Sequence, residues 1–305
     1  MLRQAPPISE FDGLQVFMCG TSSPLPAPNR AQACVAVLAG ESLYLVDAGA
    51  GSAQVASLAG LPLQRLEAVF LTHFHSDHIA AIPEFNLNSW VAGRPQPLSV
   101  IGPAGVVEVV DGLNAAYGLD QTYRVAHHGA ELLPPDLGVM RSKLMEGGAA
   151  LTFGDLTVTS FVVNHDPVRP AVAYRFEYQG RSVVISGDAV VNRDLIAAAT
   201  DADLILQDTL SLPIIKTLEE VSAGTRMERI FHDIQDYHAH ADDLAALVEQ
   251  SGVQQLAVYH LVPPPSNALF EKIYSRDLPD GTVVTEDGMI FELPAGSEKV
   301  TVIAP

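Results

Sequence analysis

The sequence predicts an α/β protein whose sheets are covered by helices. Short apolar runs rich in Val, Leu and Ile recur along the 305 residues and end at Gly, Asp or His, which is typical of strands. These runs are continuous rather than alternating, as expected for strands buried on both faces. Segments with apolar residues at helical spacing lie between several of the runs, which favours a mixed α/β core.

Strands are expected in both halves of the chain. They cover residues 14–20, 33–40, 43–49 and 67–73 in the first part, and residues 156–165, 171–178, 182–189, 202–209 and 254–261 in the second. Helices are expected over residues 77–92, 102–118 and 240–252, from their apolar spacing and their capping residues.

Two segments are expected to be irregular. Residues 118–138 are rich in Pro and Gly, which predicts a loop or an excursion from the core. In the tail, Asp287-Gly288 lies between apolar residues and predicts the turn of a β-hairpin.

The chain is expected to form a single domain over residues 1–305, because no low-complexity linker divides it. Residues 43–49 and 183–189 are both apolar strands with an Asp near the end. This parallel is compatible with two pseudo-repeated halves that meet near residue 150.

The charge balance bears on the partners. Lys and Arg total 17 and Asp and Glu total 36, for a net charge of −19. Such a surface repels polyanions, and the sequence has no Lys/Arg cluster, so we expect no long nucleic acid as a partner. A small-molecule ester substrate is favoured, because a pair of bound dications can reverse the local field.

No membrane association is expected either. No apolar run approaches the roughly 20 residues needed to span a bilayer. The segment 1–13 lacks the apolar core of a signal peptide. The compartment stays open between the cytoplasm and, if a signal peptide has been removed, the periplasm.

The two cysteines, Cys19 and Cys34, lie at the ends of neighbouring strands, where buried free thiols are favoured over a single disulfide.

The strongest chemical signal is the run "LTHFHSDH" at residues 71–78. It places His73, His75, Asp77 and His78 where a strand gives way to a helix. Residues two apart in an extended segment point to the same side, and neutral imidazoles with a carboxylate suit Zn²⁺, with Mn²⁺ or Fe²⁺ as alternatives. A capping aspartate with exposed histidines is the alternative interpretation.

Further ligand-type residues follow other strands. His165 ends the run at 156–165, Asp188 follows "VVIS", and His260 follows "LAVY". A ligand site at the edge of a sheet is built where strands end, so these three side chains are candidates to complete a metal centre.

These motifs resemble the metallo-β-lactamase superfamily. "LTHFHSDH", "NHD", "SGDA" and "VYH" occur in the family's order, and "CGTSSPLPAPNRAQACVAV" before "YLVDAG" resembles the ribonuclease Z, arylsulfatase-like and phosphodiesterase-like branch. The resemblance implies a four-layer αββα sandwich with two metal ions at one edge, and it suggests a homodimer. It assigns His73, His75 and His165 to one ion and Asp77, His78 and His260 to the other.

The resemblance also assigns supporting and catalytic roles. Asp188 would bridge the ions, and Asp47 would fix the histidine loop by hydrogen bonds. Two such ions share a hydroxide and aim it at an ester. His238, which matches the histidine of a His-x-Thr motif, is a candidate proton donor, with a helix-capping role as the alternative. The threonine position holds His240 instead. The predicted catalytic residues are Asp77, Asp188 and His238.

Small phosphodiesters, or related phosphonate or sulfate esters, are the expected substrates. The basic, glycine-rich arm of true ribonuclease Z is missing, and "RSKLMEGG" is at best a remnant of another of its segments. Lactone or β-lactam hydrolysis and a non-catalytic metal-binding or sensor role remain alternatives. Phe85, Trp90 and residues 210–221 are either walls of a substrate pocket or ordinary core, whereas His127, His128 and His232 are expected at the surface.

Overall fold

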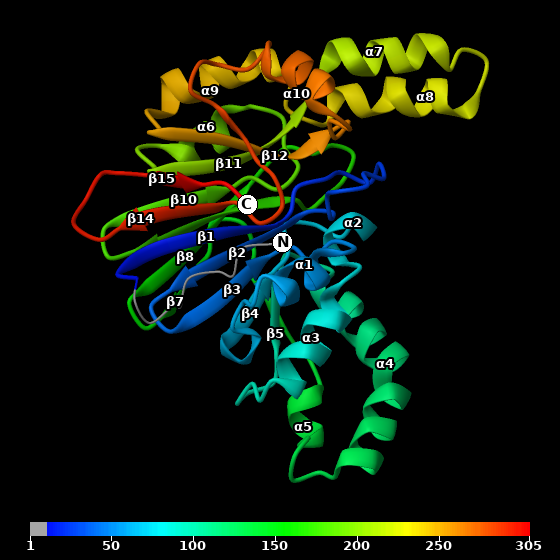
Figure 1. Ribbon diagram of the computed structural model, residues 1–305, viewed down its shortest axis with the longest axis vertical. Coiled ribbons are helices and arrows are strands. Elements are labelled where there is room, and N and C mark those ends of the chain that lie inside the picture. The colour runs from blue at the N-terminus through cyan, green and yellow to red at the C-terminus, as the bar shows by residue number, and fades with distance from the viewer. Residues whose placement is uncertain (1–10) are drawn as a thin grey trace.

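The computed structural model describes residues 11–305, and two β-sheets packed face to face form its centre. Helices lie on the outer side of each sheet, so the molecule has four layers (Figure 1). The fold is the predicted αββα sandwich. Most of the N-terminal segment considered for a signal peptide lies outside the described residues. Among residues 11–305, no helix combines the length and the apolar character needed to cross a lipid bilayer.

The first sheet has the strand order β15-β14-β1-β2-β3-β4-β5-β6. Its strands are β1 (Gly13–Gly20), β2 (Cys34–Ala39), β3 (Ser42–Val46), β4 (Leu66–Phe70), β5 (Ser99–Gly102), β6 (Arg141–Leu144), β14 (Ile290–Pro294) and β15 (Thr301–Ile303). Neighbours from β3 to β6 are parallel, and the pairs from β15 to β3 are antiparallel.

The second sheet has the order β13-β12-β11-β10-β9-β8-β7. Its strands are β7 (Ala150–Phe153), β8 (Leu156–Val162), β9 (Val172–Tyr178), β10 (Arg181–Ile185), β11 (Leu204–Leu210), β12 (Gln255–Val262) and β13 (Val283–Val284). The chain therefore passes from one sheet to the other between Leu144 and Ala150, and its last two strands return to the first sheet. That the two halves are pseudo-repeats remains a prediction.

The main core lies between the sheets. Val16, Val37 and Val183 are fully buried there, and aromatic rings pack edge to face, with the centroids of Phe70 and Phe176 5.4 Å apart. Burial of each such side chain contributes about 1.5–3 kcal/mol, so the inner faces of the two sheets hold the sandwich together.

Two further clusters attach the helices. On the first sheet lie α1 (Ser52–Leu58), α2 (Ser76–Ile79), α3 (Ile82–Val91) and α4 (Val106–His128), and on the second lie α6 (Arg193–Ala199), α9 (Leu244–Ser251) and α10 (Ala268–Ser275). Helix α5 (Pro135–Gly138) packs against α3 and α4. Two more helices, α7 (Leu212–Val221) and α8 (Arg226–Asp233), pack on each other and extend away from the sandwich (Figure 1).

All the predicted strands are present, but two helical boundaries differ from expectation. The helix predicted over residues 77–92 is split into α2 and α3, because Pro83 in the first turn of α3 has no N–H with which to continue α2. The loop predicted over residues 118–138 is wrong in its first half. Helix α4 runs on to His128, and Gly118 is tolerated inside it, costing only about 1 kcal/mol relative to Ala.

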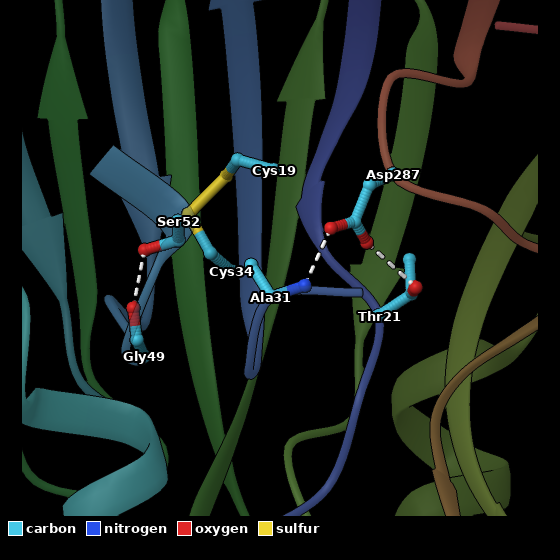
Figure 2. Close-up of a disulfide and its surroundings, with 7 residues drawn as sticks. All are labelled: Cys19, Thr21, Ala31, Cys34, Gly49, Ser52 and Asp287. Carbon is cyan, nitrogen blue, oxygen red and sulfur yellow. Dashed lines mark hydrogen bonds between the residues drawn. A yellow bond between two sulfur atoms is a disulfide. The ribbon is translucent and has the colours of Figure 1, made fainter. Parts of the chain in front are cut away.

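The hairpin predicted at Asp287-Gly288 is also wrong. Strand β13 before it pairs with β12 in the second sheet, whereas β14 after it pairs with β1 in the first. The segment therefore crosses between sheets. The Asp287 carboxylate accepts hydrogen bonds from the Thr21 hydroxyl (2.7 Å) and the Ala31 amide (2.5 Å), which ties the crossing to the loop after β1 (Figure 2).

The expectation of free thiols is wrong as well. Cys19 and Cys34 form a disulfide between β1 and β2 (Figure 2). The antiparallel register places Gly20 opposite Cys34, and an irregularity between Met18 and Gly20 brings Cys19 alongside, with its Cα 5.0 Å from that of Cys34. Spacing alone does not reveal this register, because it depends on how the two strands pair.

Candidate metal centre

The candidate site lies at one edge of the sandwich, where strands of both sheets end. His73 follows β4 in the first sheet, and His165 and Asp188 follow β8 and β10 in the second. His260 lies within β12. These side chains are buried. Burial of polar groups costs free energy unless they are hydrogen-bonded, paired or bound to a metal, so such a dense buried cluster indicates a binding site.

Local backbone features bring the segments together. Gly187 has φ +62°, and a Cβ at this position would lie 2.7 Å from the Cβ of Thr72, so glycine lets the Asp188 loop approach the histidine loop. Asp47 (φ 60°) and His260 (φ 44°) also adopt positive φ, which non-glycine residues rarely do. Such backbone strain is typical of functional sites held by their surroundings.

The structure brings all seven predicted ligands together in two groups. Within each group, the potential ligand atoms lie within 4.8 Å of one another; the groups are His73, His75, His165 and Asp188, and Asp77, His78 and His260. Asp188 lies between them, because its carboxylate oxygens are 3.4 Å from Nε2 of both His78 and His260 and 3.8 Å from Nε2 of His165. This grouping agrees with the division into two metal sites; the ligand roles themselves stay a prediction.

The buried nitrogens have the lone pairs that a metal requires. His165 Nδ1 donates to the Tyr237 carbonyl (2.9 Å), and His78 Nδ1 donates to the Asp47 carboxylate (2.8 Å), because both partners can only accept. In the neutral form of each ring, Nε2 therefore carries the lone pair, and neither Nε2 has a hydrogen-bond partner among the described residues. Buried polar atoms are rarely left unpaired, so the donor set fits divalent cations.

Asp47 makes the hydrogen bonds expected of it. Its carboxylate accepts from the Thr72 amide (2.9 Å), the Thr72 hydroxyl (2.8 Å) and His78. Since the only hydroxyl proton of Thr72 goes to Asp47, the hydroxyl oxygen accepts from Nδ1 of His73, 3.0 Å away. One carboxylate thus fixes the tautomer of a histidine in each group.

The electrostatics of the first group also suit metal binding. Burial lowers the pKa of His73, His75 and His165, so these imidazoles are neutral near pH 7. Burial also lowers the pKa of His78, but the carboxylates of Asp188, Asp47 and Asp77 outweigh it and raise that pKa well above its usual value. Without cations, these carboxylates therefore keep a second proton on the His78 ring. A bound cation would displace that proton.

His238, rather than His240, faces the centre. Its Nδ1 is 2.9 Å from the Asp208 carboxylate and 4.0 Å from that of Asp188, whereas His240 Nε2 donates to the Gln235 carbonyl (2.6 Å). The sequence reasoning missed Asp208. The available signal was an aspartate late in an apolar run, as in the runs that precede Asp47 and Asp188.

The other candidates lie elsewhere. Phe85 on α3 is buried in the core of the first sheet, and Trp90 on α3 is buried with its Nε1–H donating to the Pro134 carbonyl (3.1 Å), so neither is a pocket wall. His127 and His128 are exposed at the end of α4, and His232 on α8 contacts Glu219, as expected for surface residues.

Comparison with known proteins identifies the family. Residues 43–261 match the model described as the beta-lactamase superfamily domain, and the chain belongs to this superfamily. The fold and the predicted class of enzyme, a metal-dependent hydrolase, are thereby confirmed.

Relatives and solved structures are similar to most of the chain. A protein named ribonuclease Z from Mycobacterium bovis (strain BCG / Pasteur 1173P2) is 36% identical over 82% of this chain and 86% of its own length, and one from Mycobacterium tuberculosis (strain H37Rv) is 35% identical over the same shares. Among solved structures, the metallo-beta-lactamase fold protein YhfI from Bacillus subtilis (TM-score 0.66, 20% identity) and human tRNase Z, short form (0.63, 18%), each align with 92% of this chain and with 100% and 99% of their own.

These relatives correct one expectation. The exclusion of a long nucleic acid as a partner is wrong, because relatives that match most of the chain are named for action on RNA. The net charge of −19 sums over the whole surface, whereas a polyanion responds to the field where it binds. Total charge is therefore a poor guide for a protein whose site is built to hold cations.

Proposed function

We propose that this protein is a phosphodiesterase that works with two divalent metal ions. The observation that carries the proposal is the pair of ligand groups joined at Asp188, with His238 beside them. The identity of more than a third to proteins named ribonuclease Z supports phosphodiester bonds as the target, with RNA as the first substrate class and small diesters as the second.

The ligand set would hold the ions as the sequence suggests. His73, His75 and His165 would bind one ion, Asp77, His78 and His260 the other, and Asp188 both. When bound, such a pair of ions lowers the pKa of a shared water and stabilises charge on phosphoryl oxygens. Zn²⁺ suits the many imidazole nitrogens, and Mn²⁺ or Fe²⁺ are alternatives.

His238 would supply the proton for the leaving oxygen. Asp208 accepts from Nδ1, so a protonated His238 would present its Nε2–H as the donor. Asp208 is itself fixed by the Ala189 amide (3.0 Å) and the Gln207 side chain (2.6 Å). The carboxylate thus orients the imidazole.

The test is a substrate screen on protein loaded with Zn²⁺ or Mn²⁺. We expect turnover of an RNA transcript and of bis(p-nitrophenyl) phosphate, and we expect an Asp188→Ala variant to lack it. Turnover of a lactone or a β-lactam with no phosphodiester cleavage would favour the acyl-transfer alternative. Full metal loading with no turnover of any substrate would favour a non-catalytic role.

A further inference from the structure

Tyr237 joins the two functional parts of the site. It lies in the turn that leads to His238, and its ring centroid is 4.9 Å from that of His165 and 4.7 Å from that of His238. Its backbone carbonyl accepts from Nδ1 of His165 (2.9 Å). One residue therefore contacts a predicted metal ligand through its backbone and packs its ring against both that ligand and the predicted proton donor.

The Tyr237 hydroxyl makes no hydrogen bond to another described residue, although the ring is half-buried. The ring packs against His165 and His238, so the side chain lies beside the first ligand group and the predicted proton donor. The hydroxyl is not among the buried polar atoms that lack a partner, so it is accessible to a ligand from outside the chain.

We propose that Tyr237 is a substrate-contacting residue whose hydroxyl donates a hydrogen bond to a phosphoryl oxygen of the bound diester. This inference rests on the proposed phosphodiesterase function. The hydroxyl would hold the phosphoryl group in position beside His238 and would stabilise the charge that grows on it during cleavage.

A purely structural role makes a different prediction. If only the ring matters, Tyr237→Phe keeps every contact with His165 and His238 and should behave as wild type. If the hydroxyl binds substrate, the same variant keeps metal content and folding but loses function. A hydrogen bond to a charged group contributes roughly 1.5–3 kcal/mol, which corresponds to about a 10- to 100-fold effect.

The experiment compares Tyr237→Phe with Tyr237→Leu, and with Tyr123→Phe on the exposed face of α4 as the matched control. Metal content, thermal unfolding and steady-state kinetics on bis(p-nitrophenyl) phosphate are measured for each. We expect Tyr237→Phe to lose about 10- to 100-fold in kcat/KM with unchanged metal content and Tm. The Leu variant should in addition bind metal less tightly, and the control should not change.

A binding measurement separates this proposal from the proposed function. Inorganic phosphate is titrated into the zinc-loaded proteins by calorimetry, which needs no turnover. If the wild type cleaves no diester, the proposed function fails, but weaker phosphate binding by Tyr237→Phe still supports the hydrogen bond. If Tyr237→Phe matches the wild type within twofold in phosphate binding and in any turnover, the proposal is overturned.

Discussion

Replacement of Asp47 by Asn tests the idea that one buried carboxylate prepares both metal sites. Asp47 accepts three hydrogen bonds, from the Thr72 amide, the Thr72 hydroxyl and Nδ1 of His78. An asparagine of nearly the same shape has one acceptor oxygen and one NH₂ group. Whichever way the amide is turned, an N–H group then faces another N–H at about the 2.8–2.9 Å that now separates donor from acceptor.

The conflict is resolved by a change of tautomer. If His78 moves its proton to Nε2, it gains a partner at Nδ1 but loses the lone pair that faces the second group. His73 is affected through the Thr72 hydroxyl, 3.0 Å away. Loss of such supporting hydrogen bonds typically lowers metal affinity 10- to 100-fold, and the lost charge-assisted bond costs roughly 1.5–3 kcal/mol of folding stability.

The assay is a zinc titration in competition with a chelator of known affinity, together with thermal unfolding of the metal-free protein. Asp203→Asn is the matched control. Asp203 is also a buried carboxylate that accepts a backbone hydrogen bond, from Ser182 (2.7 Å), but it lies before the start of β11, at the end of that strand away from Asp208 and the metal centre. The control should lose stability without losing metal affinity. Wild-type affinity for both ions in a folded Asp47→Asn protein would refute the reasoning.

Four more outcomes are expected. Asp188→Ala should bind at most one ion by elemental analysis and lose roughly 10³-fold or more in turnover; near-normal turnover would exclude a bridging role. His238→Ala should lose about 10²–10⁴-fold with poor leaving groups and less with p-nitrophenolate, and equal losses would count against proton donation. Cys34→Ser should lower the free energy of unfolding by about 3 kcal/mol, since the disulfide closes a 15-residue separation; an unchanged denaturation midpoint would contradict this. Burial raises the pKa of Asp287 to about 6, above its unfolded value near 4, so its folded form prefers the proton and stability falls as pH rises through 6. Asp287→Asn should remove that fall in melts between pH 4.5 and 8, and parallel curves would argue against it.

The strands were the most predictable part of the fold. Runs such as residues 43–49 and 183–189 are continuous and apolar because both faces are covered, and this property is local to each segment. The excursion after residue 118 was less predictable. Its glycines and prolines indicate a loop, but its first half continues a helix that Val106 and Val110 already hold on the sheet.

The candidate site could be predicted to a similar extent. His73, His75, Asp77 and His78 are adjacent in the chain, and the strand-end positions of His165, Asp188 and His260 are visible as pattern breaks. Asp208 carries a weaker signal, an aspartate late in an apolar run, and Tyr237 carries none. Their importance follows from contacts with His238 and His165, which only the folded chain brings about.

The sequence by itself determined the class of fold and the type of chemistry, because apolar strand patterns and ligand-type side chains can be recognised within single segments of the chain. The tertiary structure alone decided which residues pair across the chain: Cys19 with Cys34, β14 with β1, and Asp208 with His238. Pairing of this kind depends on register and on the packing of one sheet against the other, and neither is a property of any single segment.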